Sequence, residues 1–145
     1  MKIAVQASDA GFAALISNRD HIQWKRITHV DDAILSNEFD ALFCLNDDAA
    51  SNDYTQCSLP VFINSVTDTL NEHHHPENVI RINGWIGFLN RNIWEIAGVV
   101  NAQIESILSE IGVKYGKVPD IPGLVSARVI AMIVNEAFFA KMENV

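Results

Sequence analysis

The sequence predicts an α/β fold in which a mostly parallel sheet is flanked by helices and followed by one long apolar helix. Three observations predict this class. Short strand-like runs recur between residues 3 and 118. Helical segments fill the gaps between them, and the connections are short, which is typical of such folds. A nearly continuous apolar segment then occupies residues 124–140. With 145 residues, 49% of them hydrophobic, the chain suffices for one domain with a packed core.

Seven strands are expected, each an apolar or alternating run. The run at 41–45 is continuously apolar, which is typical of a buried central strand. The run at 22–27 alternates apolar and polar residues with period two, so we expect it at an exposed edge of the sheet. The expected strands are residues 3–7, 22–27, 41–45, 61–64, 79–82, 93–96 and 114–118.

Three helices are expected between these strands, at residues 9–17, 30–37 and 101–111. The third is the best defined, because Asn101 is a good N-cap and Gly112 is a good C-terminal stop. Its apolar residues fall at i, i+3, i+4 and i+7, on one face of a helix. They are Ile104, Ile107, Leu108 and Ile111.

The segment at 124–140 contains thirteen apolar residues among seventeen, and they cover nearly the whole circumference of a helix. Pro122 suits the first turn of that helix. A helix that is apolar all round must be buried all round. Either the α/β body or a second subunit must cover it, and we predict a homodimer through this helix. The chain is thus divided into an α/β domain at 1–118 and a C-terminal helix at 119–145.

The balance of charge excludes some classes of partner. Ten Lys and Arg residues stand against 18 Asp and Glu residues, for a formal net charge of −8. Such a chain is not expected to bind nucleic acid or an anionic membrane. Its two cysteines, Cys44 and Cys57, do not suggest a disulfide framework, and Cys44 is expected in the core. No apolar window is long enough to span a bilayer or to act as a signal peptide, so a cytoplasmic protein is expected.

One segment carries a family resemblance. Residues 117–128 read KVPDIPGLVSAR, and Asn135, Glu136 and Ala137 follow. This resembles the Gly-Lys-x-Pro, Asp-x-Pro-Gly-Phe, Asn-Arg, Glu-Ala pattern of the 3-hydroxyacyl-CoA dehydrogenase family, whose helical domain belongs to the 6-phosphogluconate dehydrogenase C-terminal-like superfamily. The resemblance covers residues 60–142, roughly. It implies a shortened Rossmann-like domain followed by the start of the helical domain, and a short, divergent member of the family.

The resemblance also implies site residues. Asn64 and Ser65 fit a loop of the family, and Glu95 fits its glutamate, which orients a catalytic histidine twelve positions earlier. Asn83 stands at that histidine position. An amide has no titratable nitrogen near neutral pH, so Asn83 cannot act as a general base. Glu95 is then either a remaining acid–base group or a strand-end carboxylate bonded to neighbouring backbone or to Asn83.

Two further family positions are only partly matched. The serine that helps to hold the substrate falls among Val66, Thr67 and Asp68, and Thr67 could supply the hydroxyl. The asparagine that precedes the arginine of the family is replaced by Ala127. The candidate catalytic residues are therefore Glu95, Asn83 and Thr67.

The expected cofactor site lacks its usual glycines. A dinucleotide fingerprint needs Gly-x-Gly-x-x-Gly after the first strand, so that the backbone can approach the pyrophosphate. The corresponding turn, residues 6–11, has only Gly11, and Asp9 places a negative charge where phosphates would lie. The second strand ends at residues 26–28 without an acidic residue for a ribose. No cofactor is expected from these residues, although the resemblance makes NAD possible.

Other polar and aromatic clusters have simpler interpretations. His73, His74 and His75 are adjacent and therefore diverge, which favours a solvated loop over a metal site. Asp47, Asp48 and Asp53 also favour a solvated loop over a Mg²⁺ site, so no metal is predicted. Three aromatic residues are interpreted as core, with the alternative that they line a pocket near Asn83; they are Trp85, Phe88 and Trp94.

Three functional hypotheses follow. The first is a divergent 3-hydroxyacyl-CoA dehydrogenase-like protein without standard hydride transfer, which binds an acyl-CoA or a similar small ligand. The second is an active NAD-dependent oxidoreductase of that type with a rearranged site. The third is a non-enzymatic, dimeric interaction or regulatory module.

Overall fold

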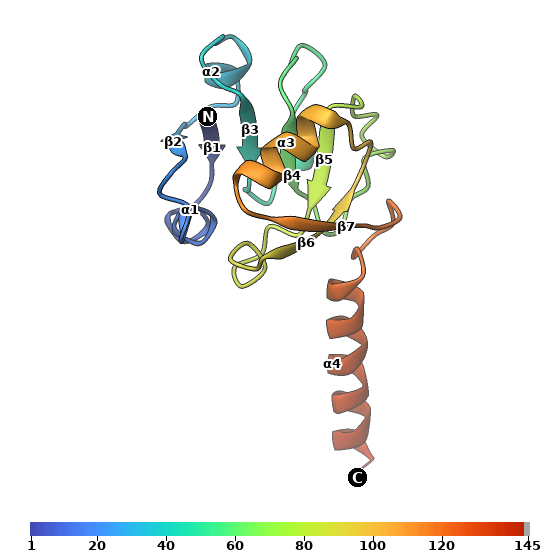
Figure 1. Cartoon of the computed structure of the whole chain (residues 1–145). Helices are drawn as coiled ribbons and strands as arrows, with labels where there is room; N and C mark the ends of the chain where they lie inside the picture. The colour runs from blue at the N-terminus through green and yellow to red at the C-terminus, as the bar shows by residue number, and fades with distance from the viewer. Residues whose placement is uncertain (144–145) are drawn as a thin grey trace.

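The computed structural model describes residues 1–143 and contains one seven-stranded sheet in the order β2-β1-β3-β4-β5-β6-β7 (Figure 1). All neighbouring strands pair in parallel except β5 and β6, which are antiparallel. The predicted α/β class is confirmed. The strands are β1 Lys2–Gln6, β2 Gln23–Arg26, β3 Ala41–Cys44, β4 Val61–Asn64, β5 Val79–Ile82, β6 Ile93–Ala97 and β7 Lys114–Lys117. The helices are α1 Asp9–Ile16, α2 Asp31–Ile34, α3 Ala102–Glu110, α4 Ser126–Met142 and the 3₁₀ turn η1 Ala49–Ser51.

The strand order places the carboxyl ends of β1 to β5 along one edge of the sheet, because these strands are parallel. The chain runs outward from β1 to β2 and then returns to β3 on the other side of β1. Ligands of open α/β sheets bind at such a reversal and along the carboxyl ends. The loops that follow β1, β3, β4 and β5 are therefore the first place to look for a site.

The core has one layer on each face of the sheet. On one face, α1 and α3 cover a cluster in which Phe43 and Phe62 stack with ring centroids 4.5 Å apart. On the other face, α2 and η1 cover a cluster that includes buried Cys44 and Tyr54. Burial of all four residues of β3 agrees with its prediction as a central strand, and β2 lies at an edge as expected.

Two of the expected helices differ from prediction. The helix expected at 30–37 is the single turn α2, which lacks a side-chain cap at its N-terminus. The C-terminal helix begins at Ser126, two residues later than expected, and Pro122 lies before its first turn. Gly123 and Leu124 have φ values of +85° and +48°, which no α-helix can contain. Leu124 is fully buried, so tertiary packing imposes this conformation.

Helix α3 has the predicted caps. The Asn101 side chain accepts a hydrogen bond from the Ile104 amide at 3.0 Å, and Gly112 adopts φ +73° just after the helix. The sequence signals were sufficient there because both are local.

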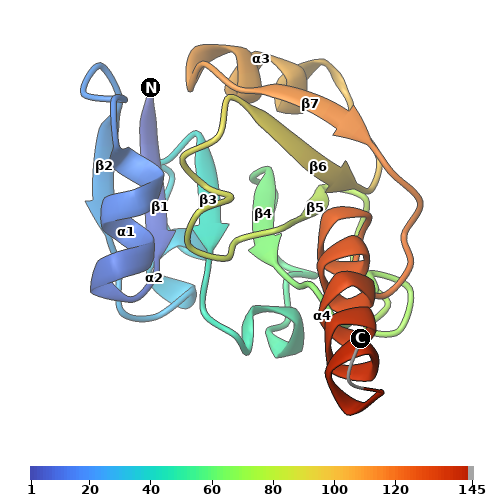
Figure 2. The ribbon, with the colours of Figure 1, turned by 90° about the horizontal axis from the view of Figure 1, so that it is seen from below.

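Helix α4 extends away from the body rather than packing on it (Figures 1 and 2). Ala127 is its only buried residue among those described, and large apolar side chains are exposed along its length. The sequence left two ways to cover this helix, its own α/β body or a second subunit. The first expectation is wrong, because the body leaves most of α4 exposed. Within residues 1–143, no helix combines the length and apolar character needed to cross a membrane.

Candidate functional site

The structure brings Asn83 and Glu95 to one small cavity of about 30 Å³ at the carboxyl end of β5. Asn83 is buried and its Oδ1 accepts a hydrogen bond from the Trp85 amide at 3.2 Å, while its Nδ2 has no partner. Thr67 is exposed and does not line this cavity. The lining residues are Asn83, Phe88, Arg91, Ile93, Trp94, Glu95 and Ser126.

Glu95 caps the N-terminus of α4. Its carboxylate accepts hydrogen bonds from the Val125 amide at 3.2 Å, the Ser126 amide at 3.0 Å and the Ser126 hydroxyl at 2.7 Å. The first amides of a helix have no partner within it, and α4 has no side-chain cap of its own. A carboxylate at that end is also favoured by the helix dipole. Glu95 therefore bonds to backbone thirty residues downstream and not to Asn83, and its oxygens are engaged.

Asn64 bridges the carboxyl ends of β3, β4 and β5. Its Oδ1 accepts from the Gly84 amide at 3.0 Å and its Nδ2 donates to the Leu45 carbonyl at 3.4 Å. A Cβ on Gly84 would lie 2.6 Å from the Cβ of Asn64, so only glycine fits there. The loop after β5 is thus held against the end of β4.

Arg81 anchors the segment that leads into α4, a role not predicted from the sequence. Its side chain is fully buried and forms an ion pair with Asp120 at 2.7 Å. It also donates to the carbonyls of Ser65, Val66 and Ile121, and the last two distances are 2.8 and 2.9 Å. The one available signal was a charged residue inside the apolar run at 79–82.

Asp120 and Gly123 extend this anchor. The second carboxylate oxygen of Asp120 accepts from the amides of Leu70 and Asn71 at 2.9 and 3.3 Å. The Gly123 amide donates to the Val66 carbonyl at 2.6 Å. The Asp-x-Pro-Gly motif of the sequence therefore serves here to attach α4 to the loop after β4.

The turn after β1 does not fit the pyrophosphate of a dinucleotide. Ser8 caps α1 by accepting from the Gly11 amide at 3.1 Å, and Asp9 lies in the first helical turn. Arg26, at the end of β2, forms an ion pair with Asp9 and donates to the Ala7 carbonyl at 2.7 Å. A phosphate would have to compete with the Asp9 carboxylate for both the helix dipole and Arg26.

We expect NAD to bind this protein no more tightly than in the millimolar range, about −4 kcal/mol, for this reason. Isothermal titration calorimetry with NAD measures the affinity directly. A dissociation constant in the micromolar range, roughly −8 kcal/mol, would contradict the prediction. Asp9→Ser is the matched variant, since it keeps the turn polar and removes the competing carboxylate, and it should bind NAD at least as well as the unmodified chain.

The histidine triplet forms a loop against η1. His73 and His74 are exposed as expected, but His75 is half-buried, with its ring 5.4 Å from that of Tyr54 and 5.6 Å from that of His73. Its Nε2 is buried without a partner. Burial, followed by repulsion from His73, lowers the pKa of His75. Within the described residues, no three His, Cys, Asp or Glu side chains are arranged to hold a metal ion.

Acidification below neutral pH is expected to destabilise the fold through His75. Its pKa is lower in the folded chain than the unfolded value of 6.5. The unfolded chain therefore takes up a proton first, and the free energy of unfolding falls as the pH drops below 6.5, roughly. Urea unfolding between pH 7.5 and 5, roughly, tests this. His75→Gln should flatten the pH dependence, whereas exposed His74→Gln should not; equal slopes for both variants would contradict the assignment.

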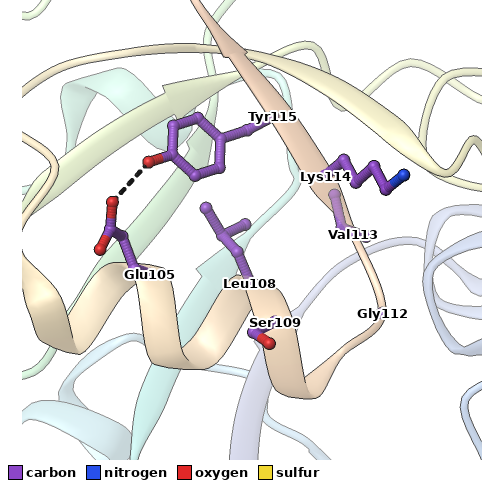
Figure 3. A pocket seen from close by; sticks show the side chains of 7 residues that line it. All are labelled: Glu105, Leu108, Ser109, Gly112, Val113, Lys114 and Tyr115. Atoms are coloured by element: carbon purple, nitrogen blue, oxygen red, sulfur yellow. Dashed lines mark hydrogen bonds between the residues drawn. The ribbon is translucent and has the colours of Figure 1, made fainter.

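A larger groove of about 470 Å³ lies between α3 and β7 (Figure 3). The Tyr115 hydroxyl donates to Glu105 at 2.7 Å across it, which raises the pKa of Tyr115. The groove shares no lining residue with the Asn83 cavity. Tyr115 and Glu105 satisfy each other, and none of its buried polar atoms lacks a partner among the described residues, whereas the Asn83 cavity holds the unpartnered Nδ2 of Asn83 and is the stronger candidate site.

Solved structures of dehydrogenases share this fold. An NAD⁺-dependent dismutase, 5-formyl-3-hydroxy-2-methylpyridine 4-carboxylic acid 5-dehydrogenase, is similar with a TM-score of 0.73 and 14% identity over 98% of this chain. The chain spans 65% of the length of that protein. An (S)-3-hydroxybutyryl-CoA dehydrogenase from Ralstonia eutropha has a TM-score of 0.69, 12% identity and coverage of 99% and 72% of the two chains.

A 3-hydroxyacyl-CoA dehydrogenase from Archaeoglobus fulgidus has a TM-score of 0.69 and 14% identity, with coverage of 100% of this chain and 65% of the other. No family model and no curated protein sequence matches the chain. The strand order and the mostly parallel pairing define a Rossmann-like α/β domain. The chain shares its fold with 3-hydroxyacyl-CoA dehydrogenases and related dehydrogenases, which is the fold that the resemblance of its sequence motifs implied.

Proposed function

We propose that this protein is a divergent relative of the 3-hydroxyacyl-CoA dehydrogenases that has no standard hydride-transfer activity and binds an acyl-CoA or a similar small ligand beside Asn83. The observation that carries the proposal is the buried, unpartnered Nδ2 of Asn83. Leaving such a donor unsatisfied costs about 1–3 kcal/mol. An acceptor oxygen, such as the carbonyl of a thioester or of a 3-oxoacyl group, would satisfy it.

The size and charge of the site fit one end of such a ligand. The cavity of about 30 Å³ accepts a single carbonyl group and not an acyl chain. Arg91, at the rim, is exposed and lies 4.0 Å from the Phe88 ring centroid. A guanidinium there attracts the phosphates of coenzyme A. The remainder of the ligand would lie on the surface beside Arg91.

Binding without turnover is expected from the residue chemistry. The Asn83 amide can donate to an oxygen but cannot take a proton from the substrate. The Glu95 oxygens are engaged by α4 and do not orient a base. Both arguments favour a binding protein over the alternative of an active oxidoreductase with a rearranged site.

Thermal unfolding with acetoacetyl-CoA, free CoA and NAD tests the proposal. Acetoacetyl-CoA at a hundred times its Kd should stabilise the fold by about 2.7 kcal/mol. Free CoA at the same concentration should stabilise it by less, because CoA lacks the acyl carbonyl. Asn83→Leu should remove the difference between the two ligands and still fold, since it removes the unsatisfied Nδ2, gives up only the bond from the Trp85 amide and keeps a side chain of similar size.

Thr67→Ala is the matched control, since Thr67 is exposed and outside the cavity, and it should respond as the unmodified chain does. No stabilisation by acetoacetyl-CoA would count against the ligand proposal. Stabilisation by NAD together with turnover would favour the active oxidoreductase. If no ligand stabilises the fold, the exposed apolar surface of α4 favours the non-enzymatic interaction module.

A further inference from the structure

Strand β7 ends the sheet with an edge to which no strand within residues 1–143 pairs (Figure 2). On its inner side, the amides of Lys114 and Val118 donate to carbonyls of the β6 segment at 2.8 and 2.9 Å. Alternate residues of a strand direct their main-chain groups to opposite sides. Tyr115 and Lys117 therefore each direct an N–H and a C=O away from β6. These groups form a free template for another extended chain.

The groove of about 470 Å³ between α3 and β7 lies beside this edge (Figure 3). Leu108 and Val113 are buried and give it an apolar floor, and Tyr115 is held in place by its hydrogen bond to Glu105. Successive side chains of a strand point to opposite faces of a sheet. Every second side chain of a strand added to β7 would therefore face the groove. The groove suits an extended segment with apolar residues at alternate positions.

Gly116 leaves β7 bare in the middle of the strand. A Cβ built on this residue would meet no atom within 4 Å beyond its chain neighbours, and its φ is not in the left-handed region. Neither packing nor backbone conformation within the described chain therefore requires glycine here. A glycine inside a strand weakens the strand and often marks a place where another backbone approaches closely. The bare position leaves room beside the edge for the side chains of an added strand.

The charges on this edge indicate which kind of chain it accepts. Lys114 and Lys117 are exposed, and among the ion pairs formed within residues 1–143 none includes either of them. They form a cationic strip on a chain whose formal net charge is −8. Pairing of β7 with the β7 of a second copy would bring the lysines of both copies together, which is repulsive. Carboxylate side chains on an added strand would instead complement both lysines.

We propose that β7 and its groove dock an extended acidic segment of another polypeptide, which adds one strand to the seven-stranded sheet. The segment alternates apolar side chains, which face the groove, with acidic ones. Main-chain hydrogen bonds to Tyr115 and Lys117 hold the segment, and the groove and the two lysines select it. The groove shares no lining residue with the Asn83 cavity, so the docking does not depend on the proposed ligand.

Amide hydrogen exchange followed by NMR tests the pairing, with a short synthetic peptide in which valine and glutamate alternate as the probe. At saturation the peptide should slow exchange of the Tyr115 and Lys117 amides by about tenfold or more. A peptide with lysine in place of glutamate should bind about tenfold more weakly or worse. A peptide with proline in place of valine should give no protection, because proline has no N–H. Absence of protection by the glutamate peptide, or equal binding of the glutamate and lysine peptides, would overturn the proposal.

Two substitutions of Lys117 separate main-chain pairing from charge. Lys117→Thr loses the charge but keeps the N–H, and it should weaken binding of the glutamate peptide about threefold. Lys117→Pro also loses the N–H and should abolish the protection of Tyr115. That N–H does not bond to β6, and proline is tolerated at such edge positions, so the variant should fold. Equal affinity of the two variants for the peptide would mean that the peptide does not pair with β7.

A charge reversal tests the selectivity without changing the main chain. The double variant Lys114→Glu, Lys117→Glu should prefer the lysine peptide over the glutamate peptide, which inverts the preference of the unmodified chain. Lys141→Glu on α4 is the control, since it changes the charge of an exposed lysine away from β7 and should leave the preference as it is. A double variant that still prefers the glutamate peptide would show that the two lysines do not select the segment, against the proposal.

Discussion

With acetoacetyl-CoA and NADH, the protein is expected to turn over 10²- to 10⁴-fold more slowly, roughly, than a dehydrogenase that has its general base. Asn83 occupies the place that the family resemblance gives to the catalytic histidine, and its amide cannot accept a proton from the substrate. Following the oxidation of NADH by its absorbance measures the rate. Turnover in the ordinary enzymatic range, about 1–10³ s⁻¹, would contradict the prediction.

Restoring an imidazole at residue 83 separates the loss of the general base from the loss of a carboxylate that is free to orient it. Asn83→His returns a titratable group, but Glu95 is engaged by the amides of Val125 and Ser126 and cannot orient it without releasing α4. We therefore expect Asn83→His to remain within about tenfold of the unmodified chain. A recovery of 10²-fold or more, roughly, would mean that Glu95 can leave its capping position.

The strands were predictable because their signals are local. Continuous apolar runs such as 41–45 are buried on both faces, and the alternating run at 22–27 lies at the edge. The start of α4 was not predictable, since Leu124 takes a left-handed conformation that only its burial explains. A sequence pattern carries periodicity and caps but not the φ value that packing imposes on one residue.

The candidate site was predictable only in part. Asn83 and Glu95 meet at one cavity, as the spacing from the family motif implied, while Thr67 lies outside it. The sequence indicated Asp9 as unfavourable for phosphate but not that Arg26 pairs with it. Such pairs join residues far apart in the chain, and only the register of the parallel strands brings them together. The cap that Glu95 provides for α4 was not predictable for the same reason.

The largest loss of stability is expected for Arg81→Met. The guanidinium is fully buried, pairs with Asp120 and donates to three carbonyls, so its removal leaves one carboxylate and several carbonyls without their donor. Asp120 is 26% exposed, so the loss should approach but not exceed the 3–5 kcal/mol, roughly, of breaking a fully buried ion pair from one side, a large part of the 5–15 kcal/mol, roughly, that stabilises a typical domain. Urea unfolding followed by tryptophan fluorescence measures the free energy of unfolding.

Arg26→Met is the matched control, because its ion pair with Asp9 is exposed and should contribute less than about 1 kcal/mol. The loss in free energy of unfolding for Arg81→Lys should lie between the losses for Arg81→Met and Arg26→Met, since lysine keeps the charge but lacks the forked set of donors. Because Arg81 also attaches the segment that precedes α4, hydrogen exchange in the first turn of α4 should accelerate in Arg81→Met and not in Arg26→Met. If Arg81→Met unfolds as Arg26→Met does, Arg81 does not carry the attachment of α4, and the Glu95 cap alone must hold the helix to the body.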